Sequence, residues 1–140
     1  MRSPAAIFTA ALAFAAMGCE RVPPAVCDRT AEGNPTVRYT EGTAEGGVYM
    51  SSPWDGELLY FPGGMRYALE HKLGATPRWI GSYLSFSRDG TRDGGALATA
   101  TGNQVVVVGV DATAVTLAND SCVDYWLLVT AGTGEQAAPP

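Results

Sequence analysis

Apolar and polar residues alternate with a period of two over many short runs, which predicts β-strands and not helices. Met65, Tyr67 and Leu69, for example, fall on one face of such a run. The run Val105–Val108 consists only of β-branched residues, which disfavour a helix. The predicted strands are Thr36–Thr40, Gly47–Ser51, Glu57–Phe61, Met65–His71, Arg78–Ser87, Ala96–Thr101, Gln104–Val110, Ala114–Asn119 and Val123–Thr130.

Turn residues separate these strands at short intervals, and Asp111-Ala112-Thr113 is expected to form one hairpin loop. No window outside residues 1–18 has the pattern of an amphipathic helix of ten or more residues. Many short strands with regular turns predict an all-β fold of the antiparallel β-sandwich type, with a small β-barrel as the alternative.

The strand over residues 78–87 has two faces. One has Ile80, Leu84 and Phe86 together with Ser82, and the opposite face has Trp79, Tyr83 and Ser85. Core packing is expected for Trp79 and for Trp126, since large aromatic residues in strands are usually part of the core.

The N-terminal segment has the features of an export signal. Met1-Arg2 forms a short positive region, and an apolar stretch runs from Ala5 to Met17. As a helix this stretch would span about 20 Å, too short for a hydrocarbon core of roughly 30 Å. We therefore expect residues 1–18 to be a signal peptide and not a membrane-spanning helix.

The sequence Ala16-Met17-Gly18-Cys19 resembles the bacterial lipobox, in which small residues precede a cysteine that receives the lipid through a thioether. It departs from the common pattern by having Ala first and Met second. The resemblance implies a lipoprotein with Cys19 lipidated at its N-terminus, anchored stably by two or three acyl chains such as palmitate. An ordinary signal peptide cut after Gly18 is the alternative.

Cysteine parity agrees with lipidation. The chain has 3 cysteines, and lipidation of Cys19 leaves Cys27 and Cys122. Export places these two in an oxidising compartment, so we expect a disulfide bond between them that fixes the N-terminal tether to the domain. Two free thiols are the alternative. Glu20 follows Cys19 where an inner-membrane retention signal would have Asp, which favours the outer membrane of the cell envelope.

Length and charge narrow the remaining choices. Removal of the expected signal peptide, residues 1–18, leaves 122 of the 140 residues. This length is enough to form one domain with a single core. Because Arg2 is the one charge in the removed segment, the remainder has 8 basic and 14 acidic residues, a net charge of −6. An acidic surface repels phosphates, so nucleic acid is not expected as a partner. The expected divisions are a signal peptide (1–18), a lipidated N-terminus and tether (19–35), a β-sandwich domain (36–131) and a disordered tail (132–140).

Residues for catalysis or for a metal are sparse. His71 is the single histidine, and no G-x-S-x-G elbow occurs, so we expect no enzyme, no cofactor and no metal site. His71 is expected to cap a turn at a strand end. The acidic, glycine-rich loop 88–95 could offer oxygen ligands to Ca²⁺, but it lacks a closing Glu and has two Arg; we expect a flexible hairpin loop. Asn119-Asp120-Ser121 matches a glycosylation sequon and is expected to mark a turn.

The turn around Trp54 and Asp55 is the candidate ligand-binding site. An aromatic ring beside a carboxylate suits a sugar, because the ring packs on C–H faces while the carboxylate accepts hydroxyl hydrogen bonds. The alternative is a Trp54 ring that folds back over the edge of the sheet.

The segment His71-Lys72-Leu73-Gly74-Ala75-Thr76-Pro77, followed by the strand over 78–87, resembles the H-x-L-G-x-x-P turn of H-type lectin-like domains and of phage tail-fibre sandwiches. The final strand with Tyr125-Trp126-Leu127-Leu128-Val129 fits the same family shape. The resemblance implies an antiparallel β-sandwich. Family members that bind sugar do so as trimers, through residues with no counterpart here, so it implies no binding site.

Two functions agree with these features. The first is a membrane-anchored, non-enzymatic recognition module that binds a glycan or a protein partner. The second is a structural or assembly component that forms homo-oligomers through the sheet face with Trp79 and Tyr83, without a small-molecule ligand.

Overall fold

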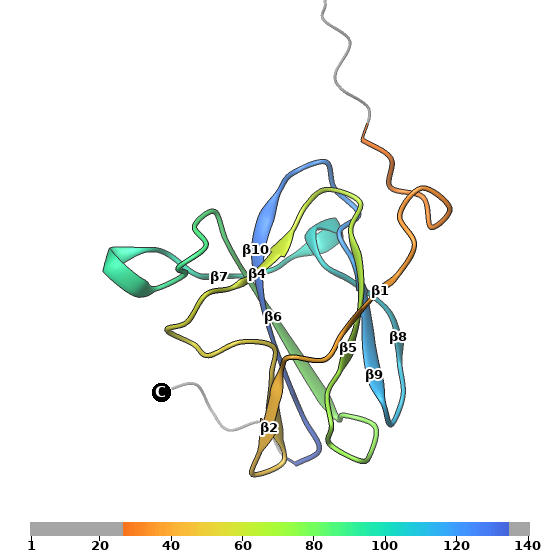
Figure 1. The fold of residues 1–140 in the computed structure, drawn as a ribbon, viewed down its shortest axis with the longest axis vertical. Helices are drawn as coiled ribbons and strands as arrows, with labels where there is room; N and C mark the ends of the chain where they lie inside the picture. The colour runs from red at the N-terminus through yellow and green to blue at the C-terminus, as the bar shows by residue number, and fades with distance from the viewer. Residues whose placement is uncertain (1–26, 135–140) are drawn as a thin grey trace, which may run out of the picture.

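Two β-sheets packed face to face form the fold of the computed structural model, which describes residues 27–134 (Figure 1). The strands are β1 (Val37–Tyr39), β2 (Thr43–Glu45), β3 (Val48–Met50), β4 (Leu59–Phe61), β5 (Arg66–Glu70), β6 (Trp79–Ser85), β7 (Ala98–Thr99), β8 (Val106–Val110), β9 (Ala114–Ala118) and β10 (Tyr125–Gly132). Two short 3₁₀ turns, η1 (Arg92–Gly94) and η2 (Gly102–Gln104), flank β7. The part of the chain that the structure describes contains no α-helix.

The first sheet has the strand order β1-β5-β9-β8, and the second has the order β2-β3-β10-β6-β7 with β4 also paired to β10. Every pairing is antiparallel except that of β1 with β5, which is parallel. The prediction of an all-β antiparallel sandwich is confirmed. The barrel alternative is wrong, because the two sheets remain separate and do not close on each other.

The inward faces of both sheets supply the core. Tyr67 and Leu69 of β5 lie opposite Leu117 and Val115 of β9, and all four are buried. In the second sheet Leu127 of β10 pairs with Leu84 of β6. The predicted face with Met65, Tyr67 and Leu69 is confirmed, since Met65 packs against this core as well.

The two tryptophans that were expected in the core, Trp79 and Trp126, lie outside it. Both are half-buried on the outer face of the second sheet. Trp126 alternates with the buried residues Tyr125 and Leu127, so its ring must point away from the core. Phe86 is 81% exposed because β6 ends one residue earlier, at Ser85, and the alternation no longer applies.

The N-terminal segment of the described region is fastened to the turn that precedes β10. Cys27 and Cys122 form a disulfide with their Cα atoms 5.5 Å apart, as predicted. Arg29 donates from Nη1 to the carbonyl of Asp120 at 3.0 Å, and Arg66 donates to the carbonyl of Arg29 at 3.1 Å. The expected signal peptide, the lipidated Cys19 and most of the expected tail (135–140) lie outside the described residues.

Candidate functional site

The turn with Trp54 and Asp55 is fixed to the loop that follows β6. The Trp54 ring packs edge-on against Tyr83, with ring centroids 5.1 Å apart, and Trp54 is 45% exposed. The carbonyl of Asp55 accepts from Nη2 of Arg92 at 2.8 Å, and Thr91 donates to the carbonyl of Trp54 at 3.3 Å. Trp54 thus covers part of the outer sheet face, as the alternative interpretation of this residue had it, while Asp55 stays exposed.

The acidic loop 88–95 is held by its own arginines. Asp89 pairs with Arg92 at 3.7 Å, and Arg92 also donates to the carbonyl of Asp55. Among residues 27–134 no group of three or more His, Cys, Asp or Glu side chains is placed to hold a metal ion. No helix in the same range is long and apolar enough to cross a membrane.

His71 is fully buried and joins two turns. Its Nδ1 accepts from the backbone N–H of Leu73 at 3.2 Å, so Nε2 is the atom that donates to the carbonyl of Asp111 at 3.0 Å. Both ring nitrogens are therefore occupied by the backbone, and neither is open to a ligand. This is the turn-capping role that the sequence predicts.

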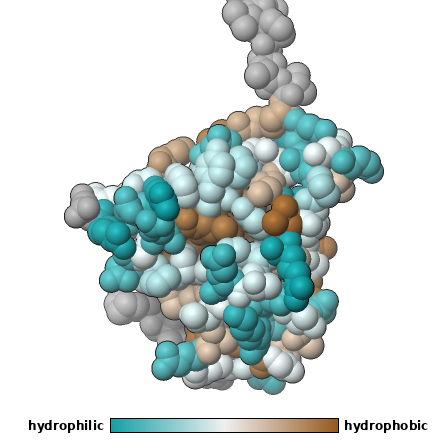
Figure 2. Space-filling model, viewed as in Figure 1, coloured by the Kyte–Doolittle hydropathy of each residue, from teal (hydrophilic) through white to brown (hydrophobic). Residues whose placement is uncertain are grey.

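A groove opens at the side of the sandwich where the chain crosses from the first sheet to the second between β1 and β2. It consists of two adjoining hollows with volumes of about 250 and 320 Å³, which share Tyr39, Glu41 and Glu57 in their linings. Figure 2 shows an apolar patch among hydrophilic side chains near the middle of the molecule, in the region where Figure 1 places β4 and β10. We call the two hollows the edge groove.

Aromatic rings line one half of the edge groove. Tyr60 of β4 and Trp126 of β10 are paired across the two strands, and their ring centroids are 5.0 Å apart at an angle of 47°. Tyr60 is 44% exposed, so its ring is open to a ligand. Tyr39 closes the same hollow from β1 and is fixed by donating its hydroxyl to the carbonyl of Ser51 at 2.8 Å.

Hydrogen bonds also fix Tyr60. Its hydroxyl donates to Oδ2 of Asp124 at 3.0 Å, which raises the pKa of the Tyr60 phenol. The other carboxylate oxygen of Asp124 accepts from the backbone N–H of Gly63 at 3.0 Å. The Tyr60 hydroxyl is thus bound by a carboxylate that is itself fixed, which lowers the entropy lost when a ligand stacks on the ring.

Charged and hydroxyl side chains line the rest. Arg88 pairs with Glu57, and its guanidinium carbon lies 6.0 Å from the centre of the Trp126 ring, within range of a cation–π contact. Glu41 belongs to both hollows and is exposed. The second hollow adds the hydroxyl residues Thr43, Ser51 and Ser52.

Open aromatic faces beside carboxylates, a guanidinium and hydroxyls can bind a ring that has apolar C–H faces and a polar rim, which describes a sugar. An added peptide strand fits less well. The hydroxyl of Tyr67 already donates to the carbonyl of Tyr60, and Asn119 donates to the carbonyl of Phe61. These two carbonyls of β4 are therefore not free to pair with a ligand backbone.

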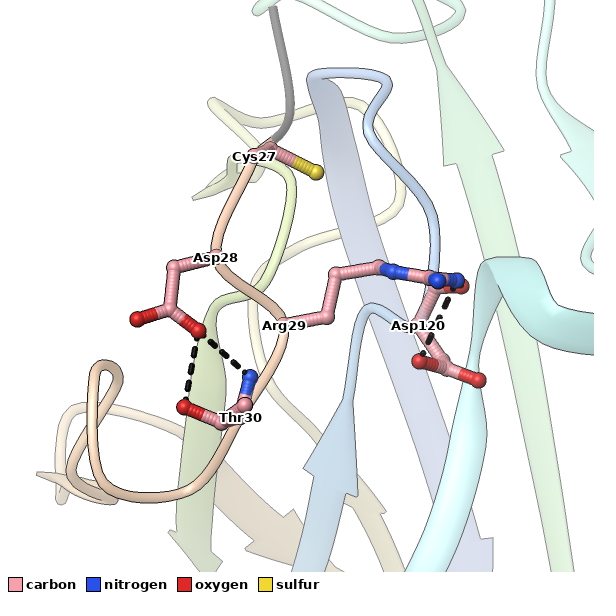
Figure 3. A pocket seen from close by; sticks show the side chains of 5 residues that line it. All are labelled: Cys27, Asp28, Arg29, Thr30 and Asp120. Atoms are coloured by element: carbon pink, nitrogen blue, oxygen red, sulfur yellow. Dashed lines mark hydrogen bonds and ion pairs between the residues drawn. The ribbon is translucent and has the colours of Figure 1, made fainter.

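A separate hollow of about 510 Å³ lies outside the edge groove, where the segment that begins at Cys27 contacts Asp120 (Figure 3). No aromatic residue lines it. In Figure 3 the Arg29 side chain reaches across it to Asp120, while Asp28 turns toward Thr30. The carboxylate of Asp28 accepts from both the N–H and the hydroxyl of Thr30, which lowers the pKa of Asp28. The polar groups that line this hollow thus bind one another.

The edge groove lies beside the turn in which the sequence predicts the ligand-binding residues. Neither Trp54 nor Asp55 lines the edge groove, although the neighbouring residues Pro53, Gly56 and Glu57 do. Alternation places the aromatic residues that do line the groove on one face of their strands, but it does not say which face is the outward one. Tyr60 and Trp126 each stand at an outward position between two inward-facing apolar residues of a strand.

No protein family, no curated protein and no solved structure matches this chain.

Proposed function

We propose that this chain is a lipid-anchored protein of the bacterial cell envelope whose β-sandwich is a non-enzymatic module that binds carbohydrate in the edge groove. The observation that carries the proposal is the aromatic pair Tyr60 and Trp126, of which Tyr60 is 44% exposed, in a lining that also includes Tyr39, Glu41 and Glu57. This is the combination that stacks on a sugar ring and accepts its hydroxyls. The proposed relationship to H-type lectin-like domains is supported only by the 71–77 turn between β5 and β6, where Gly74 has a φ of +73°.

The envelope location rests on the sequence around Cys19 and is supported by the Cys27–Cys122 disulfide, a bond expected in an oxidising compartment. Intact-mass analysis of protein extracted from membranes tests it. We expect a mature chain that begins at Cys19 and includes the mass of acyl chains. A chain that begins elsewhere, or a Cys19→Ala variant that stays fully membrane-bound, would contradict the anchor.

Assembly through the outer face of the second sheet remains the second candidate. Trp79 and Tyr83 do share that face, because they pair with Gly132 and Leu128 of β10. Trp54 packs on Tyr83, however, and both Trp79 and Tyr83 are half-buried. Trp54 thus already covers part of this face, and the groove supports the better-founded proposal.

A panel of neutral and charged oligosaccharides, titrated into the chain by isothermal calorimetry, tests carbohydrate binding. Three single-aromatic truncations distinguish the sites: Tyr60→Ala in the groove, Trp54→Ala in the adjacent turn and Phe86→Ala outside both. We expect Tyr60→Ala to weaken binding about fivefold, since losing a stacked ring costs about 1 kcal/mol. Binding unchanged by Tyr60→Ala, or no binding by the unmodified chain, would refute the proposal.

A further inference from the structure

Glu41 is the charged group of the edge groove that has no ionic partner within residues 27–134. The other two charged side chains of its lining, Glu57 and Arg88, pair with each other. Glu41 lines both hollows and lies close to Tyr39. The pKa of the Tyr39 phenol is raised, first by burial of the phenol and second by the negative charge of Glu41. A carboxylate at the junction of two hollows, beside an aromatic ring, is placed to meet a ligand from either side.

The nearby cations are already engaged. Lys72 donates from Nζ to the carbonyls of Thr40 and Gly42 at 2.7 and 2.8 Å, on either side of Glu41, and it lines neither hollow. Arg88 is held between Glu57 and the Trp126 ring. A further negative charge, Asp124, stands behind Tyr60. Within the lining, a cationic ligand therefore finds an unpaired carboxylate, whereas the one cation, Arg88, is already paired with Glu57.

We propose that the groove selects sugars with a free, protonated amine, of the glucosamine type, over neutral and acidic sugars. This inference rests on the proposed carbohydrate binding and names its ligand class. The ammonium group pairs with Glu41 and lies against an aromatic ring, a cation–π arrangement, while the sugar ring stacks on Tyr60 and Trp126. An N-acetylated sugar lacks the charge, and a uronic acid is repelled by the same carboxylate.

Calorimetric titration of the full chain with three trimers tests the selection: glucosamine, N-acetylglucosamine and galacturonic acid. We expect the glucosamine trimer to bind about fivefold more tightly than the N-acetylated trimer at low salt, the ratio for one exposed ion pair. Glu41→Gln should remove this preference, because the amide has no charge, so the glucosamine and N-acetylglucosamine trimers should then bind with equal affinity. The matched control is Glu45→Gln, an exposed carboxylate of β2 outside the groove lining, which should keep the preference.

The outcomes separate the two proposals. Equal or tighter binding of the N-acetylated or the acidic trimer overturns amine selection and leaves carbohydrate binding intact. A preference that survives Glu41→Gln also overturns it. Failure of all three trimers, together with the neutral oligosaccharides of the panel, overturns both the selection and the function on which it rests.

Discussion

Removal of the Cys27–Cys122 disulfide should cost this small domain a large part of its stability. The bond joins residues 95 positions apart, so it closes a loop that contains nearly all of the described domain. The chain-entropy relation gives about 4–5 kcal/mol for a loop of this length at 25 °C. A domain of this size has a free energy of unfolding of about 5–15 kcal/mol, so the loss would be a major fraction of it.

The native fold itself should survive the change. Without the disulfide, Arg29 still donates to the carbonyl of Asp120, and Asn34 still donates to the carbonyl of Asp28 at 2.6 Å. These contacts keep the N-terminal segment in place, so the effect should come from the greater freedom of the unfolded chain.

Urea unfolding followed by tryptophan fluorescence measures the effect in a Cys27→Ser/Cys122→Ser variant and its disulfide-bonded parent, both with Cys19→Ala so that no lipid interferes. At a urea slope of about 1–3 kcal/mol per molar, the midpoint should fall by about 2 M. A loss below about 1 kcal/mol would refute the reasoning, because it would mean that closing this loop does not restrict the unfolded chain.

Three further changes should affect stability. Asn119→Ala should lower the free energy of unfolding by about 2–3 kcal/mol, because the buried amide donates to two carbonyls. Urea unfolding measures this loss, and Asn103→Ala, at an exposed position, is the control. Equal losses in the two variants would contradict the prediction. Gly74→Ala should cost about 1 kcal/mol through its positive φ alone, since no atom lies near the added Cβ; an unchanged melting temperature would refute this. The pKa of Asp111 is lowered by backbone N–H bonds from Ala114 and Thr113, so its carboxylate stabilises the fold above about pH 4 and loses this effect as the pH falls. The stability lost in Asp111→Ala should therefore shrink from pH 6 to pH 2 in urea titrations, and a constant difference would contradict it.

Most of the strand pattern could be predicted because it depends on local alternation and on local turns. The hairpin between β8 and β9 begins and ends as expected, around Asp111. Strand β2 was missed because Thr43-Ala44-Glu45 has little apolar character. The pair Gly46-Gly47 nevertheless indicates a hairpin, and therefore a strand before it. A two-residue hairpin turn of this type requires positive φ at both positions, and both glycines have positive φ in the turn between β2 and β3.

The tryptophans and the groove could not be predicted in the same way. The outward position of Trp126 depends on which strand face meets the other sheet, and both neighbours on that strand are apolar. The groove combines Tyr39, Glu57 and Trp126, which come from strands and loops far apart in the chain. Only the crossing of the chain between the two sheets brings them together, and local sequence patterns do not specify that crossing.

Chemical-shift mapping of the ¹⁵N-labelled chain during titration with glucosamine trimer tests the central claim most directly. Binding in the edge groove predicts the largest shifts at residues 39–42, at residues 57–60 and at the indole N–H of Trp126. Shifts centred on Trp54 and Asp55, or on the outer face around Trp79, would place the ligand elsewhere and contradict the account.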